Sequence, residues 1–142
     1  LSKFSTGITV VCVKNNNSIY GKTVNSFNSL SLNPPIVLFS LGNYSSSIEK
    51  FSKTKFLSIN ILSNKQKKIS DNFALTAPKL ENIKFVKGKN GTAIIANCIA
   101  NLECKIVDKI KKGDHIIFIC KILELQSNDK LKPLVYFNSK YC

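Results

Sequence analysis

The sequence predicts a mainly β protein, a small antiparallel barrel with two short helices. Short apolar runs rich in β-branched residues recur along the chain, and turn-forming residues separate them, which is typical of strands joined by hairpins. Only two segments have a helical pattern, and each follows a serine that has glutamate or glutamine three residues later. The 142 residues are enough for one domain with a substantial core and too few for two.

The N-terminal half is expected to contain four strands. Apolar runs fall at 8–13, 19–22, 36–41 and 56–62. Asparagines and a serine at 15–18 predict a turn that makes the first two a hairpin. Pro34 and Pro35 cannot lie inside a central ladder, so the third strand is expected to start at Ile36. The polar segment 23–31 before them is interpreted as a loop.

Two short helices are expected. The first covers 47–53, and the second follows the segment 63–66. In the second, Ile69 and Phe73 are four residues apart and share one face. The backbone amides at the start of the first helix provide a place where an anion can bind.

Three more strands are expected in the C-terminal half, at 101–110, 115–123 and 134–137, with a hairpin turn at 111–114. The segment 74–91 is interpreted as a lid or surface loop with at most one short strand. The strand at 115–123 is apolar on both faces. Such a strand lies either in the centre of a closed barrel or in a subunit interface, and it predicts a homodimer.

The chain is strongly basic, with a formal charge of +13, and every cationic residue apart from the single histidine is lysine. The lysines are spread along the chain, whereas a nucleic-acid-binding protein concentrates them in a patch with interleaved aromatic residues. A basic, nucleic-acid-associated β-barrel therefore remains a minor alternative. Because there is no arginine, a phosphate would have to be held by lysine, hydroxyl groups and backbone amides.

The cysteines indicate a reducing, cytoplasmic location. Five cysteines stand at 12, 98, 104, 120 and 142, with no Cys-x-x-Cys pair, and three of them lie in apolar strand patterns. With His115 as the only histidine, no metal site is expected. No apolar run reaches transmembrane length, and no signal peptide is visible. The absence of methionine suggests that a short N-terminal piece precedes this sequence.

No motif for catalysis by side chains alone is present. There is no Ser-His-Asp pattern, P-loop or Gly-x-Gly-x-x-Gly, and the acidic residues are few. A Cys–His nucleophile is conceivable, but the cysteines occupy positions typical of a core. If the protein is an enzyme, a bound cofactor would supply the reactivity. The hydroxyl and amide side chains within 23–31 suit a planar, uncharged ring, although a plain polar loop has the same composition.

Four segments in series resemble the flavin reductase family of FMN-binding split barrels. They are Phe4-Ser5-Thr6-Gly7-Ile8-Thr9-Val10-Val11; the stretch 21–35 with Thr-Val-Asn-Ser-Phe and Ser-Leu-x-Pro-Pro; the stretch 56–63 with Gln66, Ser70 and Phe73-Ala74; and Gly113-Asp114-His115. The order and spacing continue through 133–137 and Tyr141. The resemblance implies one flavin reductase-like domain over 1–142. It also implies a Greek-key-like FMN-binding split barrel with two or more short helices.

The resemblance also implies a function. Such proteins are NAD(P)H:flavin oxidoreductases that use NADH or NADPH to reduce FMN or FAD, are typically homodimers, and often supply reduced flavin to a partner monooxygenase. A flavin-binding electron carrier that does not turn over NAD(P)H is the alternative within the same fold.

The implied site residues come from several segments. The isoalloxazine ring and its edge are assigned to Thr23, Val24, Asn25, Ser26, Phe27, Leu38, Phe39 and Ser40. The ribityl chain and phosphate are assigned to Ser29, Ser31, Ser46 and Ser47. His115 is placed near the nicotinamide, unless it only opens a strand, and Tyr141 would cover the nicotinamide face. Asn60 is either a cofactor contact or a structural residue. Some relatives carry arginine within the Ser-x-Ser step, and this chain does not.

Overall fold

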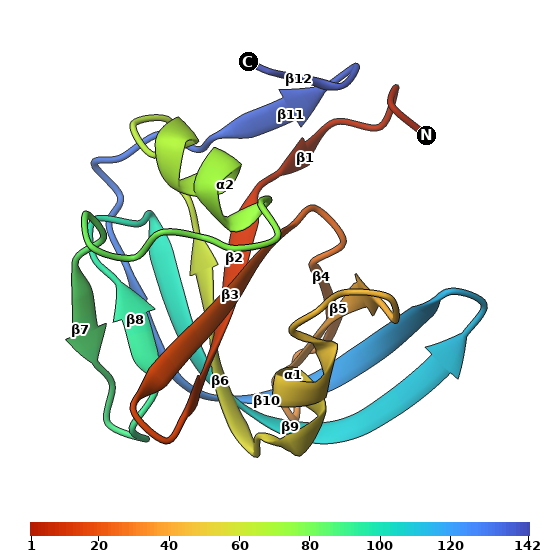
Figure 1. The fold of residues 1–142 in the computed structure, drawn as a ribbon. Helices are drawn as coiled ribbons and strands as arrows, with labels where there is room; N and C mark the ends of the chain where they lie inside the picture. The colour runs from red at the N-terminus through yellow and green to blue at the C-terminus, as the bar shows by residue number, and fades with distance from the viewer.

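The computed structural model describes residues 1–142 and is an antiparallel barrel with two short helices (Figure 1). Its main sheet has seven strands in the order β3-β2-β6-β9-β10-β5-β4. Their bounds are β2 (Thr9–Asn15), β3 (Ser18–Val24), β4 (Asn28–Ser31), β5 (Ile36–Gly42), β6 (Phe56–Ile61), β9 (Ala100–Lys112) and β10 (His115–Ser127). The sheet curls until β3 contacts β5, but no ladder joins them. The barrel is therefore split between the β3 edge and the β4–β5 edge.

The remaining elements lie outside this sheet. Three short strands pair in the order β1-β11-β12, and two others form the hairpin β7-β8. Their bounds are β1 (Thr6–Gly7), β7 (Phe85–Lys87), β8 (Ala93–Ile95), β11 (Val135–Phe137) and β12 (Lys140–Tyr141). The helices are α1 (Ile48–Lys53) and α2 (Lys67–Phe73). Neither has the length and apolar character that a membrane-spanning helix needs.

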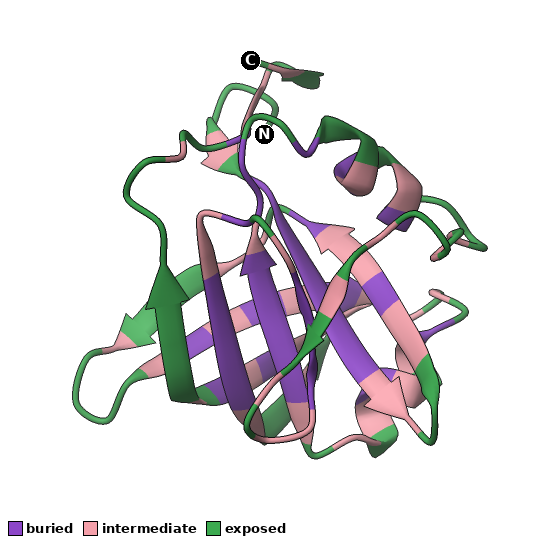
Figure 2. Cartoon of the chain, turned by 90° about the vertical axis from the view of Figure 1, so that its left-hand side faces the viewer, coloured by how far each residue is buried: buried purple, intermediate pink, exposed green.

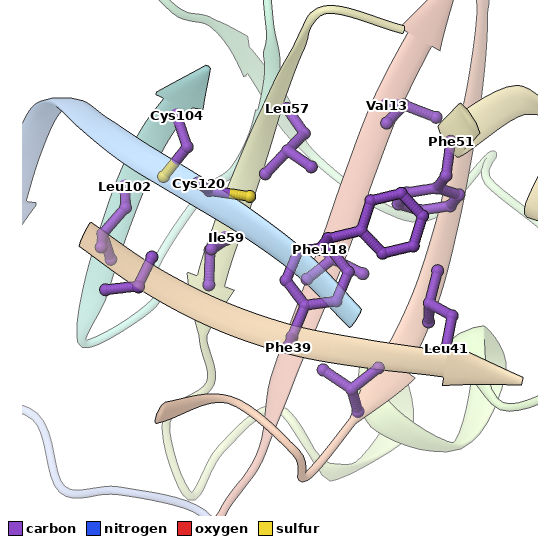
Figure 3. Packing of buried hydrophobic residues seen from close by; sticks show 13 residues of the cluster. Val13, Phe39, Leu41, Phe51, Leu57, Ile59, Leu102, Cys104, Phe118 and Cys120 are labelled. Atoms are coloured by element: carbon purple, nitrogen blue, oxygen red, sulfur yellow. The ribbon is translucent and has the colours of Figure 1, made fainter. Parts of the chain in front are cut away.

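The barrel interior is filled by side chains that alternate inward along the strands. Figure 3 shows Phe39 of β5 stacked on Phe118 of β10, with ring centroids 5.2 Å apart, and Phe51 of α1 packed edge-on against Phe118 at 6.2 Å. Figure 2 shows this burial as purple bands inside the sheet. A second apolar cluster, which includes Phe73, lies beneath α2. β10 contains the strand that was predicted to be apolar on both faces, and it lies inside the main sheet between β9 and β5.

Both predicted helices are present, but the capping prediction for α1 is wrong. The predicted pair is Ser46 and Glu49, but Ser46 makes no side-chain hydrogen bond, and Ser47, the N-cap residue, makes no capping bond either. Glu49 instead accepts a hydrogen bond from Lys53 at 2.6 Å. Before α2, the predicted interaction is half formed, because Gln66 Oε1 accepts the Ser63 amide at 2.9 Å.

The interpretation of 23–31 as one loop is also wrong. β3 continues to Val24, and Asn28–Ser31 is the edge strand β4, paired with β5 through a bulge. Only residues 25–27, here called the crossing loop, connect β3 to β4 across the split. Edge strands need only one hydrogen-bonded neighbour, so a polar, serine-rich composition is compatible with a strand there.

Candidate functional site

The split in the barrel holds a cleft of about 510 Å³. The strand ends of β3 and β5, the crossing loop, the segment before α1, the end of α2 and the start of β10 all contribute to its wall. The lining residues are Lys22, Thr23, Val24, Asn25, Ser26, Ser40, Leu41, Gly42, Tyr44, Ser45, Ser46, Phe73, Ala74, Thr76 and His115. This volume is in the range of small-molecule and cofactor sites.

The hydroxyl of Ser26 fastens the crossing loop to β5. It donates to the Ser40 carbonyl at 3.0 Å and accepts the Ser40 amide at 2.9 Å. Ser40 lies beyond the last residue of β5 that pairs with β4. The Ser26 side chain therefore bonds to β5 at a point where the β4–β5 ladder has already ended. This side chain therefore shapes the cleft wall, and the amide of Ser40, a residue assigned to the flavin edge, already donates to the Ser26 hydroxyl.

α2 forms the opposite wall and packs closely on β3. A Cβ on Gly21 would meet the Phe73 ring at 2.5 Å, so only glycine permits this approach. The hydroxyl of Thr23 donates to the Ser70 carbonyl in α2 at 2.6 Å. These contacts place Phe73 and Ala74 along the cleft.

His115 stands at the rim of the cleft because β10 begins there, in register with Gly42 of β5. Its Nδ1 is 2.7 Å from Asp114 Oδ1, and the imidazole is 44% exposed. This hydrogen bond and the charge of a protonated imidazole lower the pKa of Asp114. The side chain is thus oriented while its other ring nitrogen remains available.

The lining is neutral apart from Lys22 and the imidazole. Hydroxyl and amide groups face the cleft, and no carboxylate lines it. No group of three histidine, cysteine or acidic side chains is arranged to hold a metal ion. Such a lining suits a planar ring with neutral hydrogen-bonding edges that carries an anionic tail.

The structure brings only part of the predicted residue set to this cleft. The predicted residues in the wall are Thr23, Val24, Asn25, Ser26, Ser40, Ser46 and His115. Ser47 is buried and lines an adjacent smaller pocket. Ser29 and Ser31 lie on β4, Leu38 lies on β5, and Phe27 packs against the barrel core; none of these four lines the cleft.

Phe39 and Asn60 were assigned to the cofactor, but both are buried inside the protein. The Phe39 ring has no exposed surface and belongs to the barrel core. Asn60 is fully buried, where it donates to the Val10 carbonyl at 3.0 Å and accepts the Ile95 amide at 3.0 Å. It is therefore structural, the second of its two interpretations.

Tyr141 anchors the C-terminal strand to α2. Its hydroxyl lies 2.7 Å from Ser70 Oγ and donates to Asp71 Oδ1 at 2.8 Å. Burial raises the pKa of this phenol, and the Asp71 carboxylate adds to the rise. Tyr141 does not line the cleft, so in this chain it supports the cleft wall through α2.

Several lining residues were missed from sequence. They are Lys22, Leu41, Gly42, Tyr44, Ser45, Phe73, Ala74 and Thr76. Phe73 and Ala74 belong to the family pattern and could have been assigned from it. No sequence pattern indicated Thr76, because whether it lines the cleft depends on the path of the chain after α2.

Known proteins of one family match the whole chain. Residues 1–142 match the family described as "Flavin reductase like domain". The chain is 29% identical to the "NADH-dependent flavin reductase" of Rhodococcus sp, over 99% of the chain and 81% of that protein. It is 30% identical to "Flavin-dependent monooxygenase, reductase subunit HsaB" of Mycobacterium tuberculosis, over 99% of the chain and 77% of that protein.

A solved structure has the same fold. It is "Streptomyces globisporus C-1027 NADH:FAD oxidoreductase SgcE6 in complex with NAD and FAD fragments", which is 28% identical to the chain. The TM-score is 0.94, and the match covers 99% of this chain and 86% of the other.

Proposed function

The chain belongs to the flavin reductase-like domain family, and we propose that it is an NADH-dependent flavin reductase that uses FMN or FAD. The observation that carries the proposal is the match of the whole chain to this family, together with a cleft where the family pattern Thr23–Ser26 meets His115. A flavin-binding carrier without NADH turnover would share the fold, so the assay described below distinguishes the two.

The residues present fit a flavin. Asn25 and the backbone around the crossing loop offer neutral donors and acceptors for the ring edge. Ser46 and Lys22 provide hydroxyl and ammonium groups for a phosphate. When bound, the flavin supplies the two-electron acceptor that accepts hydride.

The side chains have to position the two substrates and exclude water. Hydride transfer needs the donor and acceptor atoms about 3–3.5 Å apart with the rings aligned. It needs no charged general acid, which agrees with a cleft that no carboxylate lines. His115 at the rim is suited to hold the carboxamide or a phosphate of the nicotinamide nucleotide, with its ring fixed by Asp114.

We further propose a homodimer and an oxygenase partner. The apolar side chains exposed on β9, β10 and the β4 region support an interface with a second copy; they are Val107, Leu123, Leu125, Leu30 and Leu32. The relatives named as reductase components of monooxygenases support a partner that consumes reduced flavin. All five cysteines are free thiols, which supports a reducing compartment such as the cytoplasm.

The decisive experiment measures NADH and NADPH oxidation by the purified chain with FMN, FAD or no flavin. Oxidation that requires both NADH and a flavin is expected. A chain that binds flavin, seen by quenching of flavin fluorescence, but oxidises neither nucleotide is an electron carrier. A chain that neither binds nor reduces flavin contradicts the proposal.

A further inference from the structure

We propose that Tyr44 is the aromatic contact residue of the cleft and that its ring stacks on an electron-poor heteroaromatic ring of a ligand. The inference rests on the proposed function and adds a positioning residue to it. Two ligand rings have this chemistry, the isoalloxazine of the flavin and the nicotinamide of the dinucleotide, and the experiment below distinguishes them. An aromatic cover was expected from Tyr141, which bonds to α2 instead.

Tyr44 lines the cleft and is nevertheless 79% exposed. The chain has four tyrosines, and the other three each pack against a lysine or another aromatic ring. Tyr20 lies under the Lys50 ammonium, and Tyr136 and Tyr141 pack on each other. Tyr44 takes part in no such pair, so both its faces are not committed to a contact of that kind within the chain.

A tight turn after β5 folds the Tyr44 ring back over Gly42. The Ser45 amide donates to the Gly42 carbonyl at 3.1 Å, and the Asn43 amide donates to the Asp114 carbonyl at 2.9 Å. A Cβ on Gly42 would lie 2.7 Å from the Tyr44 ring, so the ring occupies the space that a side chain at this position would need. Backbone bonds on both sides of the tyrosine therefore hold the ring at the rim of the cleft.

The Tyr44 ring lies on the same face of the sheet as His115. Phe39 and Leu41 of β5 belong to the barrel core, so Gly42, the next residue, faces the opposite way. His115 is the residue of β10 directly opposite Gly42. Opposite residues of an antiparallel pair share a face and lie about 4.5–5.5 Å apart. The phenol over Gly42 and the imidazole are therefore neighbours at one rim.

An exposed phenol in this position suits a flat, electron-poor ring. A tyrosine ring is electron-rich, and aromatic rings prefer offset or edge-to-face contacts. Isoalloxazine and oxidised nicotinamide are planar and electron-poor, and no carboxylate lines the cleft to repel the anionic tail of either nucleotide. Stacking also removes from water an aromatic surface that is otherwise exposed.

Three variants test the contact. Tyr44→Leu removes the aromatic ring, and Tyr44→Phe keeps the ring but not the phenol. Gly42→Ala displaces the ring, because the new Cβ needs the space that the ring occupies. The control is Phe4→Leu, since Phe4 is also 79% exposed and does not line the cleft.

The probes are riboflavin and FMN, titrated by flavin fluorescence, and oxidised nicotinamide mononucleotide, titrated by tyrosine emission. The chain has no tryptophan, so tyrosine emission can be measured directly. The KM for NADH with FMN as acceptor is measured alongside these titrations.

We expect Tyr44→Leu to weaken binding of the stacked ligand roughly twofold to tenfold, the range of an aromatic pair. Tyr44→Phe should restore that affinity. If the ring is isoalloxazine, bound riboflavin is quenched in the wild type and regains fluorescence in both variants, because phenylalanine does not donate an electron to the excited flavin. If the ring is nicotinamide, Tyr44→Leu raises the KM for NADH, and quenching of tyrosine emission by the mononucleotide is lost.

Gly42→Ala should weaken the same ligand and should add little in the Tyr44→Leu background, because the two changes remove one contact. The proposal is overturned if Tyr44→Leu behaves like Phe4→Leu with every probe, or if the effects of Gly42→Ala and Tyr44→Leu add. Failure of the proposed function has a different signature. In that case the wild-type chain oxidises no NADH with any flavin, while the riboflavin and mononucleotide titrations still report whether Tyr44 contacts a ring.

Discussion

At the scale of single residues, the cleft depends on a few side chains with separate tasks. His115 and Asn25 reach the cleft with polar groups, whereas Asn60, from the same predicted set, holds the barrel together. The difference is burial: a fully buried amide is stable only when its donors and acceptors are bonded internally, and such an amide has nothing left for a ligand.

We predict that His115→Ala impairs NADH use and leaves flavin binding nearly intact. The loss of one hydrogen bond to the nicotinamide nucleotide should cost about 1–3 kcal/mol, on the order of tenfold or more in kcat/KM. Flavin affinity should change by less than about 1 kcal/mol, because the proposed flavin contacts lie elsewhere. Stopped-flow flavin reduction against NADH concentration, with flavin titration in parallel, measures both. Asp114→Asn keeps an acceptor for Nδ1 and serves as the control; normal reduction by His115→Ala would make this histidine only the first residue of a strand.

We predict that Asn60→Leu destabilises the fold without affecting the cleft. Leucine has nearly the same size but leaves the Val10 carbonyl, the Ile95 amide and the Asn101 side chain without their partner. The free energy of unfolding should fall by about 2–5 kcal/mol. Urea unfolding measures the loss, and Asn82→Leu at an exposed position is the control. If the folded variant loses flavin affinity with unchanged stability, Asn60 is a cofactor contact after all.

At the scale of elements, the crossing from β3 to β4 decides whether the cleft exists. Three residues span the split, and the Ser26 hydroxyl is the only side chain that bonds this crossing to β5. The polar composition of this stretch thus has two uses, since Ser26 holds the backbone and Asn25 stays exposed to the cleft.

We predict that Ser26→Ala loosens the crossing and lowers flavin affinity by roughly 1–2 kcal/mol, since both hydrogen bonds to Ser40 are lost. Ser29→Ala on the neighbouring edge strand is the control and should bind flavin normally, because its side chain faces solvent. Calorimetric titration of both variants with FMN gives the comparison. Equal affinities would show that backbone pairing alone holds the crossing.

At the scale of the whole molecule, we predict a homodimer at micromolar concentration. Leu125 lies near the end of β10, where it pairs with Leu102 of β9, and it is 64% exposed. Leu125→Glu should shift the dimer toward monomer, because a charge would have to be buried in the interface. Val86→Glu, also at an exposed apolar position but on β7, should not. Light scattering after size exclusion measures the mass, and a monomeric wild-type chain would contradict the prediction.

We also predict that only Cys142 reacts quickly with a thiol reagent in the folded protein. The other four cysteines are buried. Burial raises the pKa of Cys12 and Cys120 from 9.0 to about 12 and that of Cys98 to about 11, and it raises that of Cys104 as well. They therefore remain protonated thiols, which are poor nucleophiles. All five should react in denaturant.

The same raised pKa values set a pH dependence. Below the ordinary pKa of 9.0, these thiols are protonated in both states and have no linkage effect. Above it, the unfolded chain releases protons that the folded chain retains, so the thiols reduce stability as the pH rises toward about 12. Replacing Cys12 and Cys120 by alanine should reduce this alkaline loss in urea unfolding measured against pH. An unchanged loss would assign it to other groups.

The sequence by itself determined the family, the antiparallel order of the main strands and both helices. The family follows from the series of motifs that resemble it, whereas the strands and helices follow from local periodicity and turn residues, which act over a few neighbouring positions. The residues that the sequence assigned to the site include Thr23, Asn25 and His115, and these three line one cleft. Periodicity could not distinguish β4 from a loop, because an edge strand tolerates polar residues on both faces.

Only the tertiary structure decided which polar groups are available to a ligand. Ser26, Asn60 and Tyr141 resemble the other site residues in chemistry, but each bonds to a carbonyl, amide or hydroxyl from a distant part of the chain. Lys22 shows the converse, since nothing in the sequence distinguishes it from the other lysines. The structure shows that it lines a cleft to which no acidic residue contributes. Whether a polar group is hydrogen-bonded or a charge is unpaired depends on the residues that are its neighbours in space, and the chain brings those residues together only on folding.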